Sequence, residues 1–197
     1  SPSPFPDIEH AKLSQMDLAV GRTIPIREVT VQELHTMQDE YASGALALKE
    51  IGVDCVEIHC AHGGATMGCS TISPFYNRRT DDYGGSWENR LRFDVESIQK
   101  MRSAVGPNYP IFARIDGDEL LGPRGITIEN CCEFIVPALE KAGVDCFDVS
   151  QGSILHAPQG ILIPLYYPRG CFIHLAAAVK KVTKKPVIGV GNIFDLD

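Results

Sequence analysis

The sequence predicts an α/β protein that forms part of a (β/α)8 TIM barrel. Short apolar segments alternate along the chain with longer segments of helical periodicity, a pattern typical of parallel sheets. One such unit recurs, because residues 50–58 (EIGVDCVEI) resemble residues 141–149 (KAGVDCFDV). No glycine-rich phosphate-binding motif follows any expected strand, which favours a barrel over a doubly wound dinucleotide-binding sheet.

The first expected elements are an entry loop, a helix and a strand. Residues 1–29 contain four prolines and little periodicity, so we expect a loop-rich entry segment there. Thr30 and Glu33 form a capping-box sequence, which places the start of the first helix at Thr30. Apolar residues then recur at helical spacing until Gly52, which is expected to end this helix. A short buried strand should follow over residues 53–59.

Three more helix–strand units are expected after this strand. Ser86 should cap the second helix, which stops at Gly106 and leads to a strand over residues 111–115. Thr127 opens a third helix, which Pro137 is expected to kink. The remaining expected elements are a strand over 146–150, a helix near 172–183 and a strand over 187–190.

Only four strands can be recognised in the chain, whereas a whole barrel takes about 250 residues. Four parallel strands cannot close on themselves. We therefore expect one incomplete domain over residues 1–197, containing about strands four to seven of a barrel. The chain begins at Ser1 rather than at a methionine. We expect it to be part of a longer protein.

The composition argues against several classes of function. A net charge of -7 disfavours nucleic acid or an anionic membrane as the main partner. No apolar stretch is long enough to span a membrane. The seven cysteines form no Cys-x-x-Cys pair, which predicts a reducing, cytoplasmic location with no disulfide framework and no structural metal site. We expect a small-molecule substrate, and a homo-oligomer is compatible with this sequence.

His59 and His62 stand three residues apart where the first expected strand ends. The carboxyl ends of strands carry the chemistry in parallel α/β proteins, so this pair is the candidate active site. A metal ion bound by the two imidazoles would need a third protein ligand. Glu57 is expected to lie on the other face of the strand or behind it, which disfavours a metal site.

Arg114 lies at the end of the next expected strand. Two interpretations apply, a cation that faces a ligand or an ordinary ion pair with Asp116 or Asp118. Asp148 alternates with apolar residues in the third expected strand, and we assign it no role. His156, in the loop after that strand, is explained more readily by ordinary loop polarity than by a substrate pocket.

Five segments together resemble the old yellow enzyme family of FMN-dependent NADH:flavin oxidoreductases. They are residues 57–63 (EIHCAHG), 77–90 (NRRTDDYGGSWENR), 113–115 (ARI), 148–152 (DVSQG) and 186–191 (PVIGVG). The pattern is most similar to the branch that contains 2-enoate and 2,4-dienoyl-CoA reductases. The resemblance implies a barrel of which this chain supplies the central fragment.

The resemblance also implies a reaction and roles for particular residues. His59 and His62 match the pair that holds the substrate oxygen, where negative charge develops during hydride transfer. Arg114 matches the arginine beside the flavin, and Val190 with Gly191 matches the strand end near the FMN phosphate. The implied reaction is reduction of the C=C bond of α,β-unsaturated carbonyl or enoyl thioester compounds, with FMN as cofactor and NAD(P)H as reductant. An iron–sulfur cluster and FAD are expected only in regions of the parent protein beyond this chain.

One position departs from the family pattern. The family usually carries a tyrosine, the proton donor, two residues after the second histidine, and Gly64 stands there instead. Thr66, Cys69 and Tyr76 are nearby alternatives, and water is another. The glycine keeps open a flavin-dependent amine dehydrogenase-like member of the same superfamily. A further alternative is an inactive fragment whose activity resides only in the longer parent.

Overall fold

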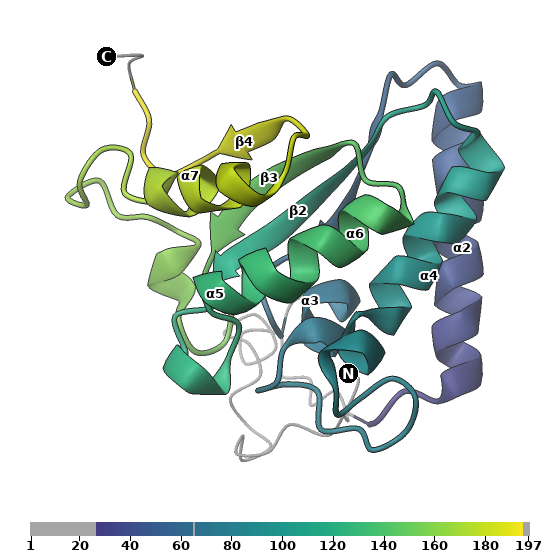
Figure 1. The fold of residues 1–197 in the computed structure, drawn as a ribbon, viewed down its shortest axis with the longest axis horizontal. Coiled ribbons are helices and arrows are strands. Elements are labelled where there is room, and N and C mark those ends of the chain that lie inside the picture. Colours follow the sequence, from purple (N-terminus) through teal and green to yellow (C-terminus); the bar gives the residue numbers. More distant parts are fainter. Residues whose placement is uncertain (1–26, 65, 195–197) are drawn as a thin grey trace, which may run out of the picture.

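A four-stranded parallel sheet forms the centre of the structure (Figure 1). The structure is a computed structural model that describes residues 27–64 and 66–194. The strands, in both chain order and spatial order, are β1 (Val56–Cys60), β2 (Ile111–Asp118), β3 (Cys146–Gln151) and β4 (Val187–Gly189). The α-helices are α2 (Val31–Glu50), α3 (Met67–Ile72), α4 (Trp87–Val105), α5 (Ile128–Asn130), α6 (Val136–Ala142) and α7 (Ile173–Val182). Parallel neighbours joined by helices confirm the predicted α/β class.

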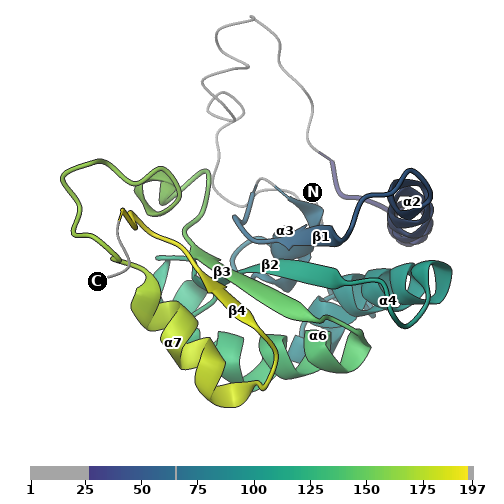
Figure 2. The ribbon, with the colours of Figure 1, turned by 90° about the horizontal axis from the view of Figure 1, so that it is seen from above.

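The two faces of the sheet differ in what they carry. Figure 2 shows α4, α6 and α7 along one side of the strands. The apolar core lies between these helices and the sheet, and its fully buried members include Ile98, Ile111, Ile115, Leu139, Phe147 and Val179. Burial alternates strictly along β1, so its buried residues face the core and the residues between them face away. That second face carries the polar residues of the site.

Strand register aligns four residues across this second face. His59 pairs with Arg114, Arg114 with Asp148, and Asp148 with Ile188. Three polar side chains from three strands therefore form one row. The register of β2 shifts directly after Asp116, where the strand bulges close to its carboxyl end.

Three predicted helix starts are confirmed. The Thr30 hydroxyl accepts the Glu33 N–H, while the Glu33 carboxylate accepts the Thr30 N–H at 2.8 Å. Ser86 caps α4 and Thr127 caps α5. These side chains satisfy N–H groups that have no partner within the helix, which is why each helix begins where it does.

Some predicted boundaries were wrong by a few residues. Helix α2 ends at Glu50, and Gly52 follows that end with a φ of 88°. Strand β1 begins at Val56, not at residue 53. Within the expected entry loop, residues 27–29 have no regular structure, and the rest of that segment lies outside the described residues.

The helix predicted to kink at Pro137 is distorted one turn earlier. Helix α5 gives way to a π-helical segment, Cys131–Ile135, before α6 begins. The N–H of Val136 donates to the carbonyl of Cys131, five residues back, so this turn is wider than an α-helical turn. Pro137 lacks an N–H, and its ring crowds the preceding turn, so the wide turn gives that ring room.

Helix α3 was not expected from the sequence. Thr66 caps it by accepting the N–H of Cys69 at 3.3 Å. Its Gly68 weakens the helical pattern, and a Cβ at that position would lie 2.5 Å from an Asp94 carboxylate oxygen. Packing thus requires a residue that has a low helix propensity. A six-residue helix with a glycine gives little periodic signal.

Candidate active site

His59 and His62 lie close together at the carboxyl end of β1. Their ring centroids are 5.3 Å apart and the ring planes cross at 80°. The Ala61 N–H donates to Nδ1 of His59 at 3.3 Å, so a neutral His59 ring carries its hydrogen on Nε2. Partial burial, and then the nearby His62 and Arg114, lower the pKa of His59 to about 4. His59 is therefore a neutral hydrogen-bond donor near neutral pH.

His62 is held in an uncommon backbone conformation by a buried carboxylate. Its φ of 64° lies in the left-handed region, which residues other than glycine rarely adopt. The His62 N–H donates to Oδ2 of Asp116 at 2.6 Å, and His62 Nδ1 lies 3.4 Å from Oδ1 of the same carboxylate. The two side chains are 8% and 0% exposed. Asp116 thus ties the loop after β1 to β2.

Arg114 lies beside His59 on the neighbouring strand. Its Nη1 donates to Oδ2 of Asp148 at 2.7 Å. The ion pair therefore forms with β3, and not with Asp116 as one interpretation of the sequence had it, because paired residues of adjacent strands face the same side of a sheet. The Arg114 side chain is 30% exposed, so part of the guanidinium can reach a ligand.

Val190 and Gly191 follow β4 directly, at the same end of the sheet. Gly191 is buried, has a φ of 119°, and leaves no room for a side chain, because a Cβ would lie 2.9 Å from Phe172. Strand β3 separates these residues from Arg114. The structure thus brings the two histidines and Arg114 together and places the other pair further along the same edge.

Thr66 and Cys69, two of the suggested proton donors, are committed to structural bonds. The Thr66 hydroxyl donates to the carbonyl of Ala61 at 2.8 Å. The Cys69 thiol is completely buried and donates to Asp116 at 3.2 Å. Burial and then the neighbouring carboxylates raise the pKa of Cys69 well above its ordinary value. Neither group is arranged to give a proton to a substrate.

Tyr76, the third suggestion, joins the loop after β1 to the loop after β3. Its hydroxyl lies 2.5 Å from Ser153 Oγ and 2.7 Å from His156 Nδ1. Ser153 Oγ also donates to the carbonyl of Gly63 at 3.2 Å. A Cβ on Gly64 would lie 3.2 Å from the Tyr76 hydroxyl, so this tyrosine occupies space beside the absent side chain. His156 is exposed, which connects the Tyr76 hydroxyl to solvent through a titratable ring.

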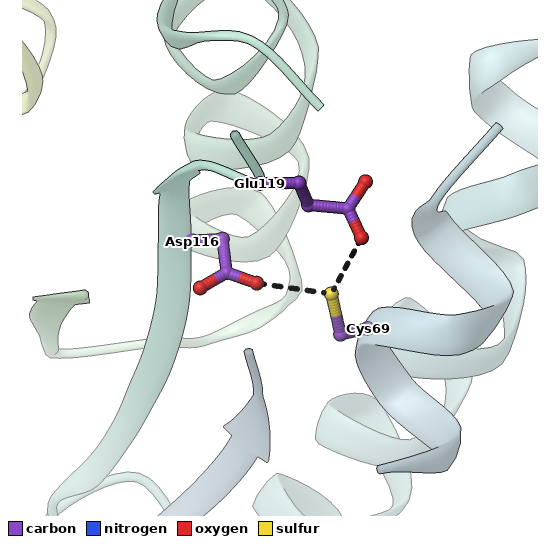
Figure 3. A group of neighbouring side chains, drawn as sticks. All are labelled: Cys69, Asp116 and Glu119. Atoms are coloured by element: carbon purple, nitrogen blue, oxygen red, sulfur yellow. Dashed lines mark hydrogen bonds between the residues drawn. The ribbon is translucent and has the colours of Figure 1, made fainter. Parts of the chain in front are cut away.

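A buried cluster that the sequence did not reveal lies next to the histidines. Figure 3 shows Cys69, Asp116 and Glu119 turned toward one another. Oε2 of Glu119 accepts from the Ser73 hydroxyl at 2.7 Å and from the Ile126 N–H at 2.8 Å. Burial raises the pKa of Asp116 and raises that of Glu119 to about 7. The one signal for this cluster in the sequence was the pair of carboxylates, Asp116 and Glu119, just after the strand predicted over residues 111–115.

Hydrogen bonds from the Cys69 thiol explain why these three side chains lie together. The Cys69 sulfur lies 3.2 Å from a carboxylate oxygen of Asp116 and 3.8 Å from one of Glu119. The ligand atoms of the three residues lie within 4.8 Å of one another, a spacing that would also suit a metal ion. Each of the three side chains already takes part in a hydrogen bond. The absence of a metal in this protein stays a prediction.

Glu57 lies behind His59 on the same face of β1, because alternate residues of a strand point to one side. Of its two expected placements, the one behind His59 is confirmed and the one on the other face is wrong. Burial and the nearby Asp148 raise the pKa of Glu57, with Arg114 opposing them. Glu57 therefore belongs to the polar face, one layer further from the carboxyl edge than His59.

The sequence matches known proteins over nearly its whole length. The profile of the NADH:flavin oxidoreductase / NADH oxidase family matches residues 7–197. The chain belongs to this family. It is 39% identical over 167 residues to the NADH oxidase of Thermoanaerobacter brockii, which covers 85% of this chain and 25% of that protein. It is 34% identical over 169 residues to the dimethylamine dehydrogenase of Hyphomicrobium sp. (strain x), which covers 85% of this chain and 22% of that protein.

A solved structure of the same family supports the fold. The 2-naphthoyl-CoA reductase in complex with 2-naphthoyl-CoA superimposes with a TM-score of 0.72 at 32% identity, covering 83% of this chain and 24% of that one. The chain spans about a quarter of the length of these three relatives. Its four parallel strands are part of the (β/α)8 barrel of the family, which confirms both the predicted fold class and the resemblance. The extent of the domain stays a prediction.

Proposed function

We propose that the protein containing this chain is an FMN-dependent oxidoreductase that uses NAD(P)H to reduce the C=C bond of α,β-unsaturated carbonyl or enoyl thioester compounds. The observation that carries the proposal is the pair of imidazoles beside Arg114 at the carboxyl end of the sheet. The similarity to a 2-naphthoyl-CoA reductase supports a thioester substrate. The similarity to an NADH oxidase supports a nicotinamide reductant.

The polar face of the sheet fits a flavin. Arg114 is a permanent cation, and its bond to Asp148 fixes the position of the guanidinium edge that is left for a ligand. Oδ1 of Asp148 is buried without a hydrogen-bond partner among the described residues, so the face still has an unused polar atom. Arg114 would lie against the pyrimidine edge of FMN, and Val190 with Gly191 near its phosphate. When bound, FMN supplies hydride transfer.

His59 and His62 would hold the carbonyl oxygen of the substrate. Negative charge develops on that oxygen as the β-carbon receives a hydride, and N–H donors that are already in place stabilise this charge. His59 meets this requirement as a neutral ring with its hydrogen on Nε2. Removal of one such donor typically lowers kcat by about 10²- to 10³-fold.

The double variant His59→Ala with His62→Ala, made in the full-length protein, tests this role. We expect FMN content to be retained, because the proposed flavin contacts are Arg114, Val190 and Gly191. Reduction of 2-cyclohexenone should fall by at least about 10³-fold. His174→Ala, which removes an exposed histidine of α7, is the matched control and should leave turnover unchanged. Undiminished turnover in the double variant would contradict the proposed role of the two histidines.

Amine oxidation is the second candidate function. Gly64 provides no tyrosine hydroxyl where the ene-reductases usually have one, and the chain is similar to a dimethylamine dehydrogenase. The two functions are separated by comparing the rate of dimethylamine oxidation, coupled to an artificial electron acceptor, with the rate of NADH-dependent reduction of 2-cyclohexenone. Turnover of the amine without turnover of the enone would replace the first proposal by this one.

A third possibility is that this chain has no activity by itself. A titration of the isolated 197-residue chain with FMN, followed by quenching of flavin fluorescence, separates the cases. Saturable one-to-one binding would show that its own residues form a usable flavin site. No binding by a folded chain would assign the flavin site to the longer protein, where any iron–sulfur cluster or FAD is also expected.

The proposed partner is a small molecule, with neither nucleic acid nor membrane involved. The net charge of -7 supports this, and none of the described helices has both the length and the apolar character to cross a membrane. All seven cysteines are free, which supports a reducing, cytoplasmic location. A homo-oligomer is compatible with the structure, and sedimentation of the purified protein would decide it.

A further inference from the structure

Asp116 contacts His62 through both of its carboxylate oxygens. Oδ2 accepts the backbone N–H of His62 at 2.6 Å, and Oδ1 lies 3.4 Å from the ring atom Nδ1. Neither Nδ1 of His62 nor Oδ1 of Asp116 has a hydrogen-bond partner among the described residues, so the 3.4 Å ion-pair contact joins two buried atoms that are otherwise unpartnered. Asp116 and His62 are both buried. Water does not screen the contact.

The hydrogen atoms of this pair can be assigned from chemistry. The pair is neutral overall when it is either a carboxylate with an imidazolium or a carboxylic acid with a neutral imidazole. In the first form both ring nitrogens carry hydrogen, and in the second the acid donates to Nδ1 while the hydrogen of the ring sits on Nε2. Only the pair with one proton fewer, a carboxylate bound to Nδ1–H, leaves Nε2 without hydrogen. Burial disfavours that form because it carries a net charge.

We infer that Asp116 is a positioning residue, which keeps a hydrogen on Nε2 of His62 so that this ring can donate to the oxyanion of a substrate. The inference rests on the proposed function, because it concerns how one of the two proposed donors is kept in its donating state. Both protonated forms of the pair present the same donor on the side of the ring that faces away from Asp116. Donation should therefore end only when the Asp116 carboxyl loses its proton, and burial raises the pKa of that carboxyl.

Other titratable groups around the pair act on the same proton. His59 faces the His62 ring from β1 at a centroid distance of 5.3 Å. The Cys69 thiol, from α3, donates to the same Asp116 oxygen that accepts the backbone N–H of His62. Glu119 interacts electrostatically with Asp116 from the loop after β2, and its protonation is favoured by burial.

Three further titratable side chains lie around this cluster. Tyr76 packs beneath the backbone of Gly63, and Asp94 acts on Cys69 from α4. Arg114 acts on His59 from the adjoining strand. Carboxylates thus outnumber cations around the pair, and this balance favours retention of its proton.

The test measures binding of 4-nitrophenol to the FMN-loaded full-length protein as a function of pH. The anion of this phenol mimics a substrate oxyanion, and its visible absorbance shows directly whether the bound oxygen is charged. We expect the wild type to bind the anion and to lose affinity about tenfold per pH unit once the pair loses its proton. Asp116→Asn can accept the His62 N–H through its amide oxygen and donate to Nδ1 through its amide nitrogen, so it should hold the hydrogen on Nε2 and keep its affinity for the anion at the high pH where the wild type loses it.

The same substitution made in a His62→Ala protein shows whether Asp116 acts by positioning the His62 ring or has a merely structural role. In a His62→Ala protein, Asp116→Asn should change neither the affinity nor its pH dependence, because its effect passes through the ring. Asp94→Asn is the matched control, since Asp94 is also completely buried and also accepts from a cysteine, Cys60, at 3.2 Å. This control should bind the phenolate within twofold of wild type, with the same pH dependence.

The possible failures can be told apart. If the wild type binds the phenolate and Asp116→Asn binds it equally well with the same pH profile, the inference is wrong while the proposed function stands. Equal changes in the pH dependence of binding from Asp116→Asn in the wild-type and His62→Ala backgrounds would also overturn the inference. If the wild type binds no phenolate and reduces no enone, the proposed function fails, and the inference fails with it.

Discussion

Arg114 on β2 and His59 on β1 occupy paired register positions and face the same side of the sheet. A permanent cation therefore lies beside a partly buried imidazole, and after burial and His62 it is the third cause of the low pKa of His59. Two properties that the proposed reaction requires, a cation beside the flavin and a neutral donor beside the substrate, come from one pair of neighbouring strands.

We expect Arg114→Gln to lower the midpoint potential of bound FMN and to weaken FMN binding by about tenfold, the loss expected for one charge-assisted hydrogen bond. Anaerobic titration and fluorescence quenching of the full-length protein would measure the two effects. Arg124→Gln is a suitable control, because Arg124 is not part of the row of paired residues and its guanidinium carbon stacks 5.3 Å from the centroid of the Phe75 ring. A potential unchanged by Arg114→Gln would show that the guanidinium does not face the flavin.

Tyr76→Phe should lower the free energy of unfolding by about 1–3 kcal/mol, because Ser153 and His156 lose a buried hydrogen-bonding partner. Thermal or denaturant unfolding measures this. If Tyr76 also delivers the proton to the substrate, kcat falls and its solvent isotope effect changes. If Tyr76 only joins the two loops, His156→Gln should reproduce part of the stability loss without altering the isotope effect.

Gly63→Ala should destabilise the protein by about 1–3 kcal/mol through overpacking. Its Cβ would lie 2.2 Å from Oε1 of Glu119 and 2.5 Å from the ring of Tyr76. Activity should fall as well, because the residue follows His62 directly. Gly44→Ala in α2 is the opposite case, since nothing lies within 4 Å of the added Cβ, and it should stabilise the helix by about 0.5–1 kcal/mol. Equal effects of the two substitutions on unfolding would contradict this packing.

Two buried acids, Glu119 and Asp94, should make stability decline as pH rises from about 4 to about 7, against the opposite and smaller contribution of His59, whose pKa is lowered to about 4. Burial raises the pKa of Glu119 from 4.5 to about 7 and that of Asp94 from 3.8 to about 6. An acid with a raised pKa binds its proton more tightly in the folded state, so its stabilising contribution is complete below the unfolded pKa and is lost as pH passes the folded value. Thermal midpoints across this range should show the decline, and Glu119→Gln should flatten it. Matching curves for variant and wild type would rule Glu119 out as its source.

Local features of the sequence determined the class of fold and the position of the candidate site. Thr30, Ser86 and Thr127 each cap a helix because hydroxyl acceptors satisfy nearby N–H groups, an effect within three residues of the chain. The alternation of apolar strands and helices was sufficient to predict parallel pairing. His59 and His62 could be recognised because a strand end is visible in the sequence.

Tertiary structure alone decided which side chains surround those histidines. Asp116 meets His62 across 54 positions of sequence, and Tyr76 meets Ser153 across 77. Such contacts depend on the register of neighbouring strands and on the bulge after Asp116, neither of which the periodicity of one segment specifies. Periodicity determines the face on which a side chain lies, whereas the partner it meets there is set by long-range packing.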